Sequence, residues 1–151
     1  MPTIAANYNP NIGAIVQVAI LPIENVQSPD GTPLAPPTDI MFFNALVDTG
    51  ASCTCVSAKA ASQANLKPIG KAPMAGATGS VAKNKYGFAV GFMINARQDA
   101  SGAIGGDLMA RTVNGMEFDN HGGSFDVLLG RDIICQGVLT MTPDGHFTLS
   151  L

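Results

Sequence analysis

The residues best suited to chemistry are Asp48, Thr49 and Gly50, which occur in this order once in the chain. An aspartate can act as a general base on water when a rigid turn presents it at the floor of a cleft. The apolar run at 42–47 predicts a buried strand that leads directly into Asp48. Thr49 adds a hydroxyl that can hydrogen-bond, and Gly50 lets the backbone turn close to the carboxylate. The pattern therefore predicts a turn that presents one carboxylate.

A second patterned segment lies downstream, at 127–134. Its apolar start is followed by Gly130, Arg131 and Asp132 and then by two isoleucines, which predicts a strand, a glycine and a short helix. Asp132 falls at the start of that helix, where a carboxylate can cap backbone amides or complement the helix dipole.

Between these two segments, residues 74–81 contain two glycines around a predicted turn. The residues at 86–94 then have the composition of a strand, so the pair is typical of a glycine-tipped β-hairpin. A hairpin of this kind can close over a cleft. Its expected tip consists of Gly76, Ala77, Thr78 and Gly79.

The order of these three segments resembles that of the retroviral-type aspartic proteases, the retropepsins. The resemblance extends over residues 12–151 in element order, and the three short segments carry it. It implies an all-β, single-domain retropepsin-like acid protease fold with closed or bent β-sheets. It also implies a glycine-rich flap hairpin and one or two short helices.

The resemblance further implies roles for individual residues. The catalytic carboxylate would be Asp48, on an active-site turn that continues through Thr49, Gly50 and Ala51. The flap tip would be residues 76–79, and Leu128 would line a pocket for a substrate side chain. Structural support beneath the turn would come from Gly130, Arg131 and Asp132.

Aspartic protease chemistry needs two carboxylates that share one proton, because two like charges a few ångströms apart cannot both ionise. The chain contains one such motif, so we expect a symmetric homodimer with one Asp48 from each subunit. The expected activity is that of an aspartic endopeptidase that hydrolyses extended polypeptides through an activated water, without metal or other cofactor. The alternative is a catalytically silent retropepsin-fold module that binds peptide or dimerises, although the intact motif argues against it.

Two features depart from many viral retropepsins. Ser52 stands where those proteins have a second acid that pairs with the arginine of the later motif, so Arg131 has no obvious local partner. The final residues 147–151 resemble the strand that viral members interleave between subunits. The preceding turn at 143–145 allows a self-contained hairpin instead, which leaves the arrangement of the dimer sheet open.

Length and composition favour one all-β domain over residues 1–151. The chain is 46% hydrophobic and 13% charged, with 17 Gly and 10 Pro, which suits short strands joined by turns. Residues 1–11 are expected to be a flexible or interface segment, and the Pro-rich stretch at 24–38 a surface loop. The dipeptide at 114–115, Asn-Gly, is expected to form a tight turn.

The remaining elements follow from local patterns of apolar, turn and capping residues. Strands are expected at 12–23, 39–47, 53–56, 107–113 and 125–129, with a closing hairpin of 139–142 and 146–151. Helices are expected at 58–65, capped by Ser57, and at 131–136.

Charge and hydropathy exclude several kinds of partner. The net charge is −3 and the eight basic residues form no cluster, which argues against nucleic-acid and anionic-membrane binding. No apolar run is long enough to cross a bilayer, and the N-terminus lacks signal-peptide features. The expected location is therefore cytoplasmic, with excision from a longer polyprotein as a further possibility.

The three cysteines, Cys53, Cys55 and Cys135, are interpreted as buried thiols in a reducing compartment. A zinc site is disfavoured, because neither His121 nor His146 lies at metal-ligand spacing from them. Neither histidine is a credible base beside the Asp-Thr-Gly turn, and neither Ser52 nor Ser57 has the glycine-flanked setting of a hydrolase nucleophile.

Overall fold

The computed structural model describes residues 1–76 and 79–151, so Ala77 and Thr78 of the expected flap tip lie outside the described residues. The strands are β1 (Thr3–Asn7), β2 (Ile15–Pro22), β3 (Phe42–Val47), β4 (Cys55–Ser57), β5 (Pro68–Gly76), β6 (Gly79–Gln98), β7 (Ile104–Phe118), β8 (Val127–Leu129), β9 (Val138–Met141) and β10 (His146–Ser150). The helices are the 3₁₀ turn η1 (Ile23–Asn25), α1 (Ala58–Gln63) and α2 (Arg131–Ile134).

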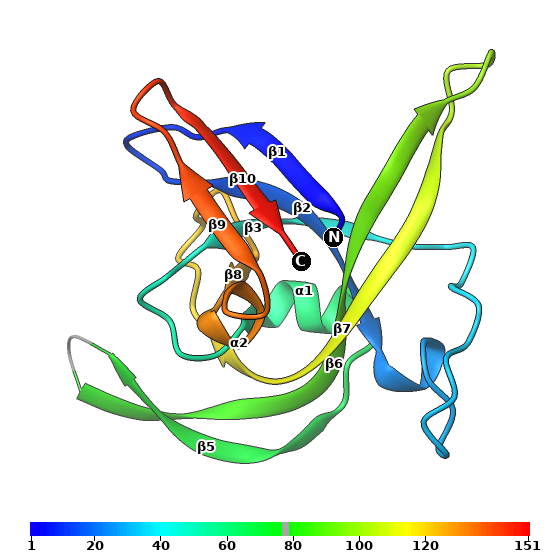
Figure 1. Ribbon diagram of the computed structural model, residues 1–151. Helices are drawn as coiled ribbons and strands as arrows, with labels where there is room; N and C mark the ends of the chain where they lie inside the picture. Colours follow the sequence, from blue (N-terminus) through cyan, green and yellow to red (C-terminus); the bar gives the residue numbers. More distant parts are fainter. Residues whose placement is uncertain (77–78) are drawn as a thin grey trace.

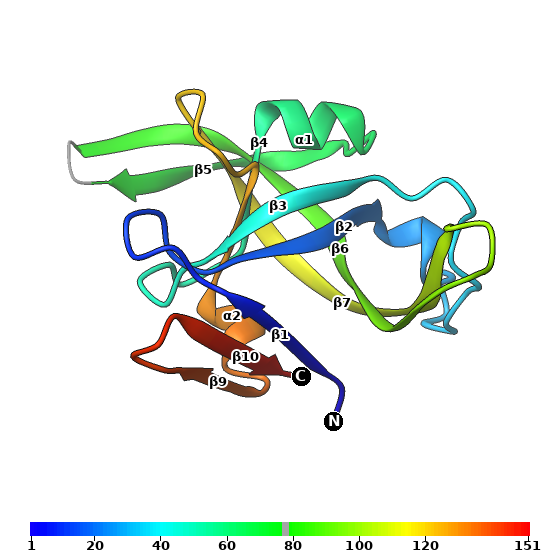
Figure 2. The ribbon, with the colours of Figure 1, turned by 90° about the horizontal axis from the view of Figure 1, so that it is seen from above.

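The larger sheet closes on itself to form a barrel. Its strand order in the described residues is β2-β3-β8-β4-β7-β6-β5, and β2 also pairs with β6. Strand β2 achieves both pairings by using its first half for β3 and its last four residues, 19–22, for β6. This closure pairs both edges of the six strands from β2 to β6 in the sheet order, and β5 lies outside the ring, paired only with β6. Figures 1 and 2 show the barrel from two directions, with α1 packed against it.

Apolar side chains from alternate strand positions fill the barrel. Phe88 and Phe92 on β6 are fully buried, as are Val18 on β2 and Leu129 on β8. Burying a side chain of this size stabilises the fold by roughly 1.5–3 kcal/mol. The central length of β6 therefore belongs to the barrel core, although both ends of the strand extend beyond it.

Strand β8 lies between β3 and β4 and determines where the Asp-Thr-Gly turn begins. It runs parallel to β3, with Leu129 opposite Val47, and antiparallel to β4. Because β3 and β8 run in the same direction, the residues that follow them emerge side by side. Asp48 and Gly130 are those residues, so the two predicted motifs meet at one end of the barrel.

Two long hairpins extend from opposite sides of the barrel. The predicted glycine hairpin is confirmed, because β5 and β6 pair from Pro68 with Tyr86 up to Gly76 with Gly79. The described part of this hairpin extends toward the same side of the molecule as the turn that follows β3 (Figures 1 and 2). The hairpin of β6 and β7 extends toward the other side in both views.

The expected tight turn at Asn114 and Gly115 is wrong. Both residues lie within β7, where Asn114 pairs with Gly87 and Gly115 pairs with Tyr86. A Cβ at Gly115 would lie 2.3 Å from the carbonyl oxygen of Thr54. This glycine therefore allows two strands to approach closely, which is the other use of a glycine inside a strand.

A smaller sheet is formed by the two ends of the chain. In the described residues its order is β1-β10-β9, with β10 between the two others. The closing hairpin predicted for residues 139–151 is confirmed, and β1, which was not predicted as a strand, pairs with β10 from Thr3 opposite Ser150 to Asn7 opposite His146. Phe147 and Leu149 anchor this sheet to the main core.

The helices are short, and their ends match local sequence signals. The predicted cap on α1 is confirmed, because the Ser57 hydroxyl accepts a hydrogen bond from the Ala60 amide at 3.0 Å. Shortly after α1, Asn65 adopts a positive φ of 54°. Across residues 1–76 and 79–151, the structure has no helix with the length and apolar character needed to span a membrane.

The close approach at Gly115 predicts a large loss of stability in Gly115→Ala. The added methyl group would clash with the Thr54 carbonyl and the Phe88 ring, and overpacking of this kind costs roughly 1–3 kcal/mol. Gly105 on the same strand is the matched control, because a Cβ there meets no heavy atom within 4 Å. Urea unfolding should show a lower free energy of unfolding for Gly115→Ala and little change for Gly105→Ala. Equal stability of the two variants would contradict the close strand approach.

Candidate active site

The turn after β3 orients the carboxylate of Asp48. Its Oδ1 atom accepts hydrogen bonds from the amides of Gly50 at 2.8 Å and Ala51 at 3.2 Å. The Asp48 amide donates to the carbonyl of Leu129 at 3.0 Å, which fixes the start of the turn against β8. No hydrogen bond reaches Oδ2 from the part of the chain that the structure describes. One oxygen is therefore fixed by the backbone, and the other accepts no hydrogen bond from the described residues.

The exposure of the turn changes along its length. Asp48 and Ala51 are partly buried, whereas Thr49 and Gly50 are exposed in the single chain. The outer surface of the turn is thus not covered by the rest of the chain.

Thr54 connects the turn to the second predicted motif. It is fully buried, and its hydroxyl donates to Oδ1 of Asp132 at 2.7 Å while its amide donates to Oδ2 at 2.9 Å. The same hydroxyl accepts a hydrogen bond from the Gly130 amide at 3.1 Å. Hydrogen bonds to a charged group are worth more than neutral ones, roughly 1.5–3 kcal/mol each. This network attaches the segment after β8 to the segment after the turn.

Gly130 and Arg131 complete the contact between the two segments. A Cβ at Gly130 would lie 2.4 Å from the carbonyl carbon of Cys53, so only glycine fits there. The Arg131 amide donates to the carbonyl of Ala51 at 2.9 Å. The Arg131 side chain is exposed, and within residues 1–76 and 79–151 it forms no ion pair. Only its backbone is seen to support the turn.

The other predicted site residues lie on β8 and on the flap hairpin. Leu128 is partly buried on β8, opposite Leu46 on one side and Cys55 on the other. Gly76 and Gly79 form the last pair of the flap hairpin, and Ala77 and Thr78 lie outside the described residues.

Sequence reasoning missed Thr54, which has no motif of its own. The one available signal is a hydroxyl residue within a stretch expected to be a buried strand, where a polar group needs a partner. That partner, Asp132, is 78 residues away along the chain, so local spacing could not identify it.

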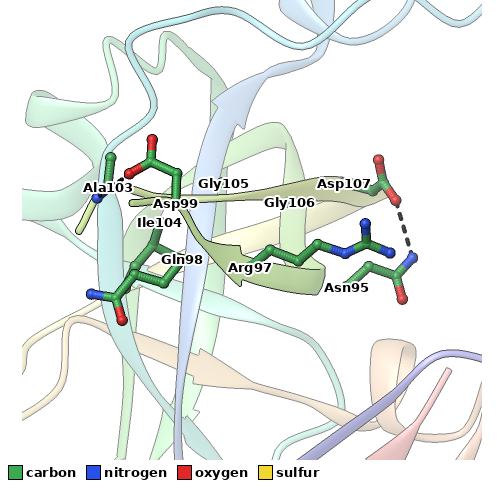
Figure 3. Close-up of a pocket in the computed structure, with 9 residues that line it drawn as sticks. All are labelled: Asn95, Arg97, Gln98, Asp99, Ala103, Ile104, Gly105, Gly106 and Asp107. Atoms are coloured by element: carbon green, nitrogen blue, oxygen red, sulfur yellow. Dashed lines mark hydrogen bonds between the residues drawn. The ribbon is translucent and has the colours of Figure 1, made fainter. Parts of the chain in front are cut away.

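A surface pocket lies away from this turn, at the end of the β6–β7 hairpin (Figure 3). Its polar side chains are largely engaged within the hairpin itself. Asn95 donates to Asp107 at 3.0 Å, and the Asp99 carboxylate accepts the amides of Ser101 and Ala103. The Ser101 hydroxyl also donates to Asp99 at 2.6 Å, and this bond, with those from the two amides, lowers the pKa of Asp99, which fits a turn-forming carboxylate. We therefore interpret this pocket as a result of how the hairpin folds, and not as a binding site.

Comparison with known proteins identifies the family. A family model described as "Aspartyl protease" matches residues 41–133, which is more than half of the chain. The chain belongs to the aspartyl protease family. The matched range contains the Asp48 turn, the flap hairpin and the segment that starts α2. No protein in the curated comparison matches this aspartyl protease.

A solved structure supports the same fold. The chain is similar to a retropepsin-like aspartic protease from Rickettsia conorii, with 14% sequence identity and a TM-score of 0.50. The match covers 97% of this chain and 89% of that chain. The chain therefore has a retropepsin-like fold, as predicted from the sequence.

The role of Thr54 can be tested with Thr54→Val, which keeps the shape of the side chain and removes the hydroxyl. The buried Gly130 amide and Asp132 carboxylate would each lose a partner, which should lower the free energy of unfolding by about 2–3 kcal/mol. Thr140→Val on the exposed face of β9 is the control and should change stability by less than about 0.5 kcal/mol. Chemical denaturation measures both. A Thr54→Val protein as stable as the control would show that the network contributes little.

Proposed function

We propose that this protein is an aspartic endopeptidase whose active site contains Asp48 from each of two subunits. The observation that carries the proposal is the Asp48 turn itself. One carboxylate oxygen is held by two backbone amides, and the turn lies on the same side of the barrel as the flap hairpin (Figures 1 and 2). With one oxygen held in this way, the second oxygen of Asp48 would be the one that activates water in the proposed reaction.

The proposed reaction uses the two carboxylates in different protonation states. The ionised carboxylate takes a proton from water while the protonated one donates to the oxygen of the scissile carbonyl. The amides of Gly50 and Ala51 keep Oδ1 of Asp48 in a fixed direction, so little reorganisation is needed during the reaction. An extended peptide would lie between the turn and the flap hairpin, with Leu128 lining an apolar subsite.

Dimerisation supplies the second carboxylate in this proposal. The chain has one Asp-Thr-Gly motif, and Thr49 and Gly50 are exposed where a second subunit would cover them. Residues at a functional surface that their own chain leaves open are candidates for an interface. Contact between the two turns would bring the carboxylates together and allow the Thr49 hydroxyls to hydrogen-bond across the symmetry axis.

The terminal sheet suggests how the subunits meet. Strand β10 already has β1 on one edge and β9 on the other, all from the same chain. Exchange of terminal strands between subunits would require this sheet to open. We propose instead that intact terminal sheets associate through their outer edges, where β9 presents the exposed apolar residues Val138 and Met141.

The catalytic role of Asp48 can be tested by substitution. Asp48→Asn keeps the shape of the side chain but removes the base, so cleavage of a denatured-protein peptide mixture should fall by about 10²- to 10⁴-fold. Wild-type activity should follow a bell-shaped profile within roughly pH 3–7, because a shared proton is lost at high pH and a second one is gained at low pH. Equal cleavage by both proteins would place the activity elsewhere. Cleavage by neither protein, if both are dimers, would favour a peptide-binding module.

The second prediction tests whether each site needs two subunits. At fixed wild-type concentration, an equal amount of Asp48→Asn should reduce cleavage to about one half, because mixed dimers capture wild-type chains. Asp99→Asn in the distal β6–β7 hairpin is the control and should add activity instead. Native mass spectrometry should detect the mixed dimers. Undiminished cleavage in the presence of detected mixed dimers would mean that one Asp48 is enough.

A further inference from the structure

Two thiols lie next to each other immediately behind the Asp48 turn. The Sγ atoms of Cys53 and Cys55 are 3.9 Å apart. The residues are two positions apart, with Cys53 in a bend and Cys55 at the start of β4, and this bend brings their sulfur atoms together. This contact is not explained by the proposed protease mechanism, which uses no cysteine.

The two thiols differ in accessibility. Cys55 is buried, Cys53 is partly exposed, and the third cysteine, Cys135, is exposed after α2. Residues 1–76 and 79–151 contain no group of three or more His, Cys, Asp or Glu side chains that could hold a metal ion. The arrangement therefore has the form of a dithiol with one accessible and one protected sulfur.

We propose that Cys53 and Cys55 form a reversible disulfide that weakens the support of the candidate active site. Hydrogen peroxide, as the oxidant, would transfer one oxygen to the Cys53 sulfur, giving a sulfenic acid and one water molecule. The Cys55 sulfur then attacks the Cys53 sulfur, the S–S bond forms, and the sulfenic oxygen leaves as a second water with the Cys55 proton. Two thiols and one peroxide thus give one disulfide and two waters, with two electrons passing from sulfur to peroxide.

The environment of the thiols sets the order of these steps. Burial, together with the neighbouring Cys53 thiol, raises the pKa of Cys55 to about 12. A buried thiol with a raised pKa is a poor first target, because the thiolate is the reactive form. Cys53, the more accessible of the two thiols, is therefore the first to react.

Thr54 connects this chemistry to the active-site turn. Forming the bond shortens the Sγ–Sγ distance from 3.9 Å to about 2.05 Å, and the backbone on either side of Thr54 must follow. The Thr54 amide and hydroxyl bind Asp132, and the hydroxyl also accepts the Gly130 amide. Moving Thr54 would disturb all three hydrogen bonds and, through them, the turn that orients Asp48.

The small ring formed by residues two apart also makes the disulfide easy to reverse. Distorted disulfide geometry stores strain, and strained disulfides have more oxidising potentials than structural ones. Mild dithiol reagents should therefore restore the thiols. The expected behaviour is that of a switch and not of a permanent crosslink.

The effect on cleavage rests on the proposed protease function, whereas disulfide formation and stability do not. The test uses the full chain carrying Cys135→Ser, which removes the exposed thiol and prevents crosslinks between molecules. The protein is treated with hydrogen peroxide, alkylated and mapped by mass spectrometry, and part of it is then reduced with dithiothreitol. Unfolding midpoint and peptide cleavage are measured at each stage. Cys53→Ser in the same background is the matched control.

The expected result is a peptide containing Cys53 and Cys55 that has lost two hydrogens, with a lower unfolding midpoint and at least about tenfold slower cleavage, since small misplacements of catalytic groups are costly. Dithiothreitol should reverse all three changes, and Cys53→Ser should show no reversible change. Alkylation of both thiols after peroxide, or a disulfide that leaves midpoint and cleavage unchanged, would overturn the inference. If the reduced protein does not cleave peptide, the protease proposal fails. The disulfide proposal is then decided by disulfide formation and by a reversible shift of the unfolding midpoint.

Discussion

The candidate active site depends on a buried threonine hydroxyl that serves two segments at once. The Thr54 hydroxyl donates to Asp132 and accepts from the Gly130 amide. A buried carboxylate or amide without a partner costs about 1–3 kcal/mol, and more when it is charged. Within the described residues no buried side-chain polar atom is left without a partner. The network is therefore complete, and a complete buried network favours one arrangement of the backbone around it.

Because the network favours one backbone arrangement, it holds the exposed Asp48 turn in one position. Asp48 follows β3 and Gly130 follows the parallel strand β8, so the two segments leave the barrel side by side. The Arg131 amide then bonds to the Ala51 carbonyl and closes the contact. A carboxylate on a free loop would change orientation whenever the loop moves. The Asp48 turn is restricted instead by its hydrogen bonds to segments that are anchored in the core.

The flap hairpin is held less firmly by packing than the Asp48 turn is. The middle of β6 lies in the barrel, where Phe88 and Phe92 are buried, but its first residues pair only with β5. A two-stranded ribbon without further packing is marginally stable, so its outer part can open at low cost. Ile69 and Val81 are exposed on this hairpin, which gives it apolar surface that a bound peptide or a second subunit could cover. Rigid turn and adaptable flap thus arise from different amounts of packing.

The sequence predicted those parts of the molecule whose signals are local. The Asp48 turn, the Ser57 cap and the closing hairpin follow from residues within a few positions of one another. The Thr54–Asp132 contact joins residues 78 apart, and no local pattern encodes such a pairing. The tight turn predicted at Asn114–Gly115 was wrong for a related reason, because glycine is used both in tight turns and where two strands approach closely. Only the position of the Thr54 carbonyl, set by the folded barrel, distinguishes the two uses.

Sharing one active site between two chains would also connect assembly to protonation. In the proposed dimer two carboxylates meet, and two charges at that distance cannot both remain without a large electrostatic cost. Where isolated subunits would be ionised, pairing must therefore take up one proton per dimer. Mass action then makes association more favourable as the proton concentration rises, until both carboxylates are protonated. The constraint that creates the catalytic pair would thus also decide when the pair can form.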